Sequence, residues 1–529
     1  MSAFDSIKLE VYIGSSWIDL TPDVVGTIVG RIGMDSSTFM ARVSDPGTLK
    51  FQLNNSSSNS QGRAGLYSPQ HANKLSGWTT NLPVMLTFLY DGHEQKFLFY
   101  IAPDGIEIDA GTSGTQRVTV ICEDWMGYAS RQIPSPLQSQ SNKTTIDAIQ
   151  TLMGLLERQP SSFAYGTPLT TFPTVFDVSS SETTILGEFN RLAMSDWGKI
   201  FTERDPLYGL RLCFQDRSGG ITFPYQRNFP KHSSECGSLL LTSGDKLLNT
   251  DNGRIVLNEQ ITIIAIPDTW YYQERPPRIV HGGVMVNQIN ILSYPRKVGT
   301  SDVVLWKMQS STKLNPGQTI SGIRGRYRDP NGQSENINGT DFITPVANTD
   351  YKAFANADGT GADLTANLSV TIEFGAAEFE MSLTNTGGTT LYTGKDILFQ
   401  VRGKTVTVYD KTEKVERDTS SIASYGKQEF TFDLKYENNI ENHSKLANAL
   451  LLNFAAPKTF MENVWMTANR NHETMVLFLY AMIGDNYPFR ETMSNANASY
   501  FINGIEFEIV GSIVYFKYTL SPYFTVVDF

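Results

Sequence analysis

The alternation of hydrophobic and polar positions predicts β-strands along most of this chain. Leu49, Phe51 and Leu53 alternate with polar residues, which is the period of a strand with one buried face. Asp91-Gly92 lies between two apolar runs, where it predicts the turn of a hairpin because glycine tolerates positive φ. The same alternation returns near the end of the chain. The pattern therefore predicts a mainly β protein.

Two short segments near opposite ends of the chain have the same order of residues. Around Gly105, an aromatic residue and an isoleucine precede turn residues, and Gly-Ile-Glu and an apolar residue follow before a second strand. The order around Gly504 is the same. We interpret both as one hairpin unit that the chain uses twice, with the glycine at a bend or bulge. Matches of this length also arise by chance between β-rich segments.

A helical period is confined to a few segments. The first places Ile146, Ile149 and Met153 on one stripe, which predicts an amphipathic helix. The same spacing recurs over 185–197 and from about 440 to 454. We expect all three stripes to face a core rather than a cofactor.

Composition and charge narrow the function classes. The 529 residues include 43 basic and 54 acidic side chains, and the resulting net charge of −11 disfavours nonspecific binding to nucleic acid or to anionic membranes. The three cysteines, Cys122, Cys213 and Cys236, lack the spacing of a metal site and are expected to be reduced thiols. No apolar run approaches the length of a membrane span.

Catalytic and metal-binding motifs are not recognised in the sequence. His472-Glu473 lacks the second histidine of a zinc protease motif, and no glycine-rich phosphate loop is present. Glu123 and Asp124 are adjacent, so they would project to opposite faces of a strand. The oxygen-rich segment 356–363 is expected to be a polar turn, with a weak calcium site as the alternative. We therefore expect no catalytic residue, no cofactor and no metal.

A row of arginines is a candidate contact surface. Arg324, Arg326 and Arg328 alternate, so a strand would present all three on one face. The first interpretation is a solvated face or a row of salt bridges between subunits. Contact with nucleic acid phosphate is the second.

An ordered series of segments before residue 126 resembles a known family. Gly47 begins the order Gly-Thr-Leu-x-Phe-x-Leu-x-Asn, and a Ser- and Gly-rich loop follows. Leu82 begins Leu-Pro-Val-x-Leu-x-Phe-x-Tyr-Asp-Gly, after which come Phe-x-Phe-Tyr-Ile and Val-Thr-Val-x-Cys-x-Asp-Trp. The series resembles the first domain of the tail hub proteins, also called baseplate hub or tail-tip proteins, of long-tailed bacteriophages. Residues 419–430 look like a strand by which hub sequences re-enter a second barrel.

The resemblance implies a mainly β fold with a smaller α/β part. The implied domains are two tube-type antiparallel β-barrels, an intervening α/β domain and an inserted β-sandwich. The expected boundaries are 1–128 for the first barrel, 129–270 for the α/β connecting domain, 271–335 plus 426–529 for the second barrel, and 336–425 for the sandwich.

The resemblance also implies a structural virion protein and not an enzyme. Three chains with two barrel wedges each would form a ring at the distal end of a phage tail, joining the sixfold tube to the threefold tip and lining the channel for DNA ejection. The implied partners are two further copies in a homotrimer, the tail tube or distal tail protein, the tape measure protein, and tip or fibre proteins. DNA would be present only in transit. Assembly would take place in the bacterial host cytoplasm.

Two other functions stay open from the sequence. The polar segment 336–425 is a candidate glycan module, which would make the chain a receptor- or carbohydrate-binding tail-tip protein. A tail-associated hydrolase is the third possibility, although no residues for it are recognised.

Charge at the two ends of the chain suggests which residues face the channel. Residues 1–130 hold 13 acidic and 8 basic side chains, and residues 431–529 hold 10 acidic and 6 basic ones. An acidic lumen would repel the DNA phosphates during ejection. Glu107, Asp109, Glu506 and Glu508 are therefore candidates for the lumen or for ring contacts.

Overall fold

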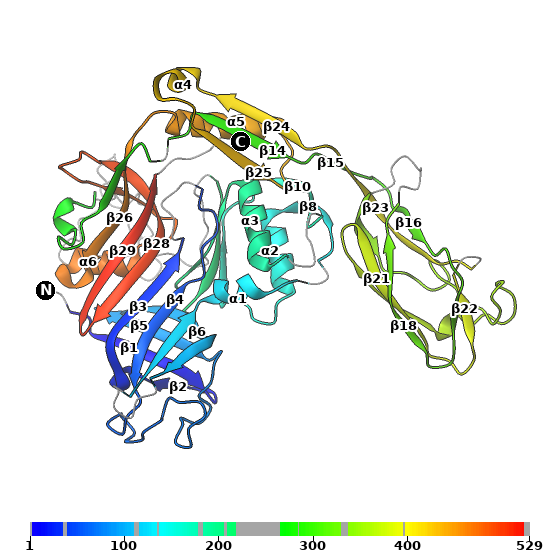
Figure 1. Cartoon of the computed structure of the whole chain (residues 1–529), viewed down its shortest axis with the longest axis horizontal. Coiled ribbons are helices and arrows are strands. Elements are labelled where there is room, and N and C mark those ends of the chain that lie inside the picture. Colours follow the sequence, from blue (N-terminus) through cyan, green and yellow to red (C-terminus); the bar gives the residue numbers. More distant parts are fainter. Residues whose placement is uncertain are drawn as a thin grey trace, which may run out of the picture.

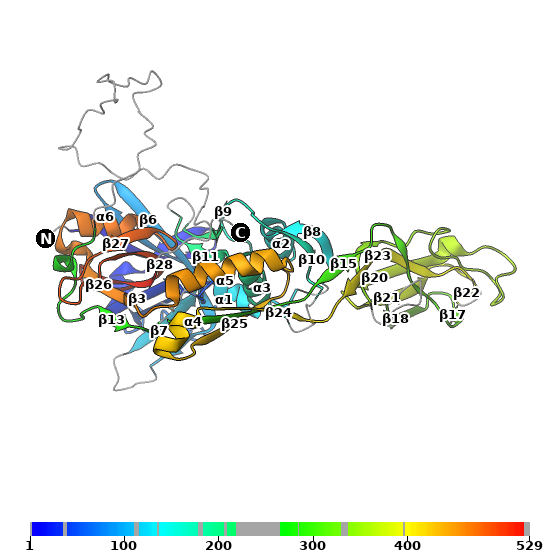
Figure 2. The ribbon, with the colours of Figure 1, turned by 90° about the horizontal axis from the view of Figure 1, so that it is seen from above.

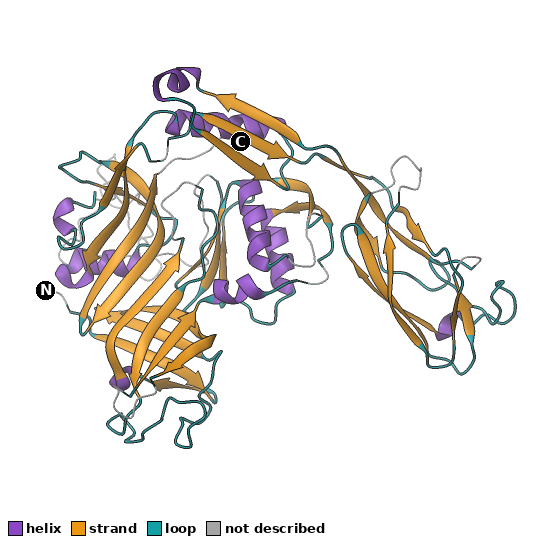
Figure 3. Ribbon diagram, viewed as in Figure 1, coloured by secondary structure: helices purple, strands orange, loops and turns teal. Residues whose placement is uncertain are grey.

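The computed structural model describes residues 3–34, 40–109, 116–134, 137–177, 183–205, 209–217, 265–283, 285–328, 337–394 and 397–522. Four bodies follow one another across Figure 1: a large sheet, an α/β body beside it, a three-stranded layer with helices above both, and a β-sandwich. Strands form most of the regular structure, and the sandwich is built almost wholly from them (Figure 3). The fold is mainly β with a smaller α/β part, as predicted.

Twelve strands, seven from residues 6–123 and five from residues 278–522, form one antiparallel sheet. Their order is β13-β26-β29-β28-β3-β4-β7-β6-β5-β1-β2, and β27 also pairs with β28. The strands from the first end are β1 (Ser6–Ile13), β2 (Ser16–Asp19), β3 (Val24–Gly33), β4 (Thr48–Asn54), β5 (Pro83–Tyr90), β6 (His93–Ile108) and β7 (Arg117–Glu123). The others are β13 (Arg278–His281), β26 (Thr459–Thr467), β27 (Asn486–Phe489), β28 (Ala498–Val510) and β29 (Ile513–Pro522).

Alternate residues of these strands point into one shared core. Leu49, Phe51 and Leu53 of β4 are buried there, as their spacing predicts. Phe507 of β28 lies edge-on to Phe88 of β5, with 5.9 Å between the ring centroids. The two ends of the chain therefore bury their apolar faces against each other, and this hydrophobic contact stabilises the sheet as one unit.

The α/β body packs a small sheet between this core and three helices. Its elements are β8 (Gln140–Thr144), β9 (Ser162–Tyr165), β10 (Thr171–Val175), β11 (Lys199–Glu203), β12 (Arg211–Gln215), α1 (Trp125–Arg131), α2 (Thr145–Gly154) and α3 (Ile185–Asp196). Phe201 and Cys213 face the core of the large sheet, whereas Ile200 and Leu212 face the helices. The predicted helices at 146–156 and 185–197 are confirmed as α2 and α3. Cys236 lies outside the described residues.

A buried ion pair joins the α/β body to α6 (His472–Tyr480). The Arg204 guanidinium donates to the carbonyl oxygens of Phe478, at 2.7 Å, and of Ala481, where α6 ends. Glu203 pairs with Arg204 and accepts a 2.6 Å hydrogen bond from the backbone N–H of Ile483. Because both charged side chains are fully buried, this bonding offsets the cost of removing them from water.

A three-stranded layer follows, in the order β24-β14-β25. Its elements are β14 (Gln288–Ser293), β24 (Thr412–Arg417), β25 (Glu429–Leu434), α4 (Thr419–Tyr425) and α5 (Ile440–Phe454). The strand expected over 419–430 is wrong in its first half, because Asp418 accepts a hydrogen bond from the Ser421 N–H and so caps a helix there. Strand β14 pairs in this layer and not in the large sheet, although its residues fall within the range expected for the second barrel.

The sandwich lies at one extreme of the molecule and projects away from the other bodies (Figure 2). Its strands are β15 (Arg296–Val298), β16 (Val303–Lys307), β17 (Thr312–Leu314), β18 (Thr319–Arg326), β19 (Asn338–Ile343), β20 (Leu368–Phe374), β21 (Glu378–Asn385), β22 (Leu391–Thr393) and β23 (Gln400–Val408). Strands β15 to β18 precede the expected boundary at 336 and nevertheless pair within it. The sandwich therefore begins before residue 336, and the boundary expected there is wrong.

Candidate ring-forming surface

The two hairpins that share a sequence order also share a structure. In the first, β6 pairs with β7 and the register shifts between Ile101 and Ile106. In the second, β28 pairs with β29 and the register shifts between Ile502 and Gly504. Both are antiparallel. The first bulge spans residues 102–105 and ends at Gly105, whereas the second is Asn503 alone, directly before Gly504. The hairpin predicted to be used twice is therefore present twice.

Backbone hydrogen bonds beside each bulge match as well. The Ile101 N–H donates to the Leu82 carbonyl at 2.9 Å, and the Ile101 carbonyl accepts from the Asn81 N–H at 2.8 Å. The equivalent residue Ile502 bonds in the same way to Asp485, at 2.9 Å, and to Gly484, at 2.7 Å. Asn81 and Gly484 both have positive φ, of 62° and 85°. The correspondence thus extends to the turns that lead into the hairpins.

A glycine is required where each strand resumes after its bulge. A Cβ atom on Gly105 would collide with the carbonyl oxygen of Ile121 on the paired strand. A Cβ atom on Gly504 would lie 2.6 Å from the carbonyl oxygen of Met34. Both sites therefore exclude any side chain, because another backbone segment approaches closely.

The repeat extends from a hairpin to a unit of five strands. The first unit has the order β3-β4-β7-β6-β5, and the second has the order β13-β26-β29-β28-β27. The strands also follow one another along the chain in the same sequence in both units. Phe51 of β4 lies opposite Val120 of β7, just as Val464 of β26 lies opposite Tyr518 of β29. The two units have one topology.

The two units meet at a strand pair that joins them into one sheet. The second half of β28, after the bulge, pairs antiparallel with β3. The register places Gly504 opposite Gly33, Glu506 opposite Arg31, and Val510 opposite Thr27. We call this pair of strands the internal junction.

A buried lysine of the α/β body holds the bulge at the internal junction. Asn503 is the extra residue of the bulge, and its carbonyl oxygen accepts a 2.8 Å hydrogen bond from the Met34 N–H. Its side-chain Oδ1 accepts from Lys199 Nζ and from Ser521 Oγ, each at 2.9 Å. Burial lowers the pKa of Lys199 well below its usual range. Sequence reasoning missed both residues, because nothing local relates positions so far apart in the chain.

The four candidate acidic residues lie on the polar face of the large sheet, opposite the core. Glu506 forms an ion pair with Lys517 and lies opposite Arg31. Glu508 pairs with Arg275 at 2.9 Å. Both carboxylates are half-buried, so they are held in place by their cationic partners.

Glu107 and Asp109 lie on the same polar face, at the end of β6, and both are exposed. Lys50 of β4 is exposed between the two pairs of acids. The structure thus brings the four predicted side chains to one face, but it interleaves them with cations. The acidic surface expected from the net charge of the chain ends is therefore a surface of mixed charge.

The arginine row lies on the sandwich, remote from the large sheet (Figure 1). Arg324 pairs with Glu380 at 2.9 Å and Arg326 with Glu378 at 3.6 Å, both on the facing strand β21. The two guanidinium side chains are 70% and 78% exposed, and Arg328 is exposed beyond the end of β18. The row is a solvated face whose charges are partly balanced within the chain.

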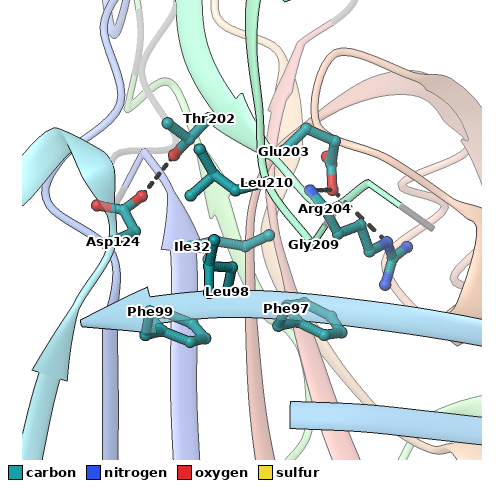
Figure 4. Close-up of a pocket in the computed structure, with 10 residues that line it drawn as sticks. All are labelled: Ile32, Phe97, Leu98, Phe99, Asp124, Thr202, Glu203, Arg204, Gly209 and Leu210. Carbon is teal, nitrogen blue, oxygen red and sulfur yellow. Dashed lines mark hydrogen bonds and ion pairs between the residues drawn. The ribbon is translucent and has the colours of Figure 1, made fainter. Parts of the chain in front are cut away.

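A small cavity lies where β6, β3 and β11 meet, and Figure 4 shows its lining. Its volume of about 10 Å³ is the space of a single water molecule. Asp124 accepts a hydrogen bond from the Thr202 hydroxyl and caps α1 through the Met126 N–H. The ionisable groups of the lining are thus engaged in structural bonds, and the cavity is a packing space.

Other candidate chemistry in the sequence has structural explanations. Glu123 forms an ion pair with Arg131, and His472 begins α6 and contacts the Tyr90 hydroxyl at 2.9 Å. Asp358 accepts hydrogen bonds from Thr360 within a turn. Within the described ranges, no three His, Cys, Asp or Glu side chains are placed to hold a metal ion, and no helix is long and apolar enough to cross a membrane.

Comparisons with known proteins find similar solved structures but no similar sequence. No family model matches the chain, and no curated protein is similar to it in sequence. A tail protein from Neisseria meningitidis is 7% identical, with a TM-score of 0.44 over 97% of this chain and 96% of the other. The 43 kDa tail protein of prophage MuSo2 from Shewanella oneidensis is 8% identical, with a TM-score of 0.44 over 97% and 98%.

A third similar structure is a component of the E. coli type VI secretion system, described as structurally similar to the bacteriophage T4 tail proteins gp27 and gp5. It is 8% identical, with a TM-score of 0.34 over 99% of this chain and 78% of the other. Two of these three similar structures are tail proteins, and the third is a component compared with tail proteins.

Proposed function

We propose that this chain is a structural protein of a phage tail, and that three copies form a hub ring at the distal end of the tail tube. The observation that carries this proposal is the duplicated five-strand unit in one continuous sheet. Three chains supply six such units, and six units match a sixfold neighbour while the ring itself stays threefold. The sequence resemblance to tail hubs supports the same assignment.

Ring closure would also protect the edges of the large sheet. An open sheet presents unpaired N–H and C=O groups at its edges, and such edges pair readily with other chains. Closed symmetry gives each edge a defined partner and so prevents open-ended association. The open edges of this chain are therefore consistent with an assembled ring.

In this proposal the polar face of the large sheet lines the passage. Lys517 and Arg275 are held in ion pairs by Glu506 and Glu508, so these cations are less available to DNA phosphates. Glu107 and Asp109 add exposed negative charge on the same face. DNA would pass such a surface without strong retention.

The partners in this proposal are a tail tube or distal tail protein above the ring, a tip or fibre protein below it, and the tape measure protein within it. The oligomer provides the direct test. Native mass spectrometry of the purified chain should give the mass of three chains, and a chain that stays monomeric at all concentrations would contradict the ring.

The sandwich favours a second candidate function, receptor or carbohydrate binding. It projects from the other bodies, as a module with its own ligand would (Figure 2). Binding of the whole chain to a glycan array would support this candidate, provided that deletion of 296–408 abolishes the binding.

A further inference from the structure

Each five-strand unit has one edge segment that is unpaired among the described residues, although the equivalent segment of the other unit is paired at the internal junction. In the second unit, the half of β28 after the bulge pairs with β3. The equivalent half of β6, Gly105 to Asp109, pairs with β7 on one side, and no described strand pairs with its other side. Likewise, β13 pairs with β26 on one side and with no described strand on the other.

These two open edges are the counterparts of the two strands in the internal junction. Strand β13 occupies the place of β3, because Arg278 lies opposite Asn463 of β26 as Val29 lies opposite Lys50 of β4. Gly282 then corresponds to Gly33, and both have positive φ, of 75° and 91°. At the internal junction Gly33 faces Gly504, whose counterpart is Gly105.

We propose that residues 105–109 of one chain pair antiparallel with residues 278–282 of the next chain, in the register of the internal junction. This inference rests on the proposed ring, and the partner is a second copy of this chain. The register places Ile106 opposite His281, Glu107 opposite Val280, Ile108 opposite Ile279, and Asp109 opposite Arg278.

The side chains on the two edges are complementary in this register. Ile108 is 47% exposed although its counterpart Phe507 is fully buried, and pairing would cover it with Ile279. Asp109 and Arg278 carry opposite charges, and the Arg278 side chain is 70% exposed, held only by a surface pair with Glu462 at 3.0 Å. The pairing would also satisfy the backbone groups of both edges.

The pairing joins two different edges, one from each chain. The rotation that relates one chain to the next therefore decides whether a ring closes. Each chain already contains one such junction between two like units. If the junction between chains repeats the internal one, every unit is related to the next by the same rotation. Three chains with alternating internal and external junctions would then close on themselves.

Paired cysteines test the register directly. In the variant I108C/I279C the two thiols face each other across the new junction, and oxidation should give covalent dimers and trimers. The control I108C/V280C places the thiols on opposite faces of the paired strands and should give neither. The single variants I108C, I279C and V280C show whether a native cysteine forms cross-links with any of the new thiols.

Charge exchange provides a second test that does not need a disulfide. D109R and R278D should each lower the fraction of trimer in native mass spectrometry, and the double exchange D109R/R278D should restore it. Both side chains are exposed, so unfolding of the monomer should change little.

The outcomes separate this inference from the proposed ring. A trimer that shows no I108C/I279C cross-link, or that forms the control cross-link equally well, would overturn the register and leave the ring intact. A chain that is monomeric in every variant would overturn the ring itself. Covalent trimers from the matched pair alone would support both.

Discussion

Lys199 and Asn503 lie 304 positions apart in the sequence, yet Lys199 Nζ donates a 2.9 Å hydrogen bond to Asn503 Oδ1 in a fully buried site. The ammonium group also lies 4.4 Å from the centre of the Phe501 ring. The bond connects the first strand of the α/β body after α3 to the bulge at the internal junction. A buried amine of this kind stabilises the bulge only while its acceptor is present.

Removal of that acceptor should destabilise the chain. N503A leaves Lys199 Nζ without its amide acceptor, and we expect a loss of about 1 to 3 kcal/mol in the free energy of unfolding. K199M in the N503A background should recover part of this loss, because no unsatisfied amine then stays buried. Urea unfolding measures both. N190A, at an exposed position of α3, is the control, and an equal effect of N503A and N190A would refute the assigned role.

Gly105 should not tolerate a side chain. G105A forces a Cβ atom against the Ile121 carbonyl oxygen, so we expect a loss of roughly 2 kcal/mol or more in stability. G154A, at the end of α2, meets no atom within 4 Å and should be neutral or slightly stabilising. Thermal unfolding compares the two variants. Equal unfolding temperatures would show that the bulge does not require glycine.

His443 should make stability depend on pH. It is fully buried in α5, and burial lowers its pKa to about 4. Between the ordinary pKa near 6.5 and this value, the unfolded chain binds a proton that the folded chain does not, so stability falls as the pH falls through this window.

The expected contribution is about 3 kcal/mol between neutral pH and pH 4. H443L should flatten the pH dependence of urea unfolding over that range, whereas H71L, at an exposed position, should leave it unchanged. If the unfolding free energies of H443L and the native chain change with pH in the same way, His443 is not the source of the pH dependence.

The ion pairs on the polar face should limit DNA binding. E506Q/E508Q releases Lys517 and Arg275, so the affinity for double-stranded DNA at low salt should rise several-fold and the increase should shrink as salt is added. E378Q/E380Q releases two arginines on the sandwich and serves as the matched control. Fluorescence anisotropy measures both affinities, and an equal rise in the two variants would mean that the polar face has no special role.

Local patterns in the sequence predicted the elements but not their long-range pairing. The two hairpins, the buried period of β4 and the three helical stripes follow from spacing within short segments. The β28–β3 junction joins strands from opposite ends of the chain, and no short-range signal specifies it. The α4 helix was missed because its start depends on one capping residue, Asp418, in an otherwise strand-like context.

The sequence showed which face of the sheet carries the candidate acidic residues but not the cations beside them. Alternation placed Glu506 and Glu508 on one face of a strand, and the structure agrees. Their partners Lys517 and Arg275 come from a facing strand and a separate loop, so net charge alone could not show that the acids are paired. The boundary of the sandwich was misplaced because the residue pattern of β15 to β18 resembles that of the strands in the large sheet.

Symmetry is the most direct test of the proposed hub. A cryo-electron microscopy reconstruction of the assembled tail, calculated without imposed symmetry, should show three copies of this chain around a central passage, with six copies of the five-strand unit facing the tube. A ring of any other copy number, or copies that enclose no passage, would contradict the account.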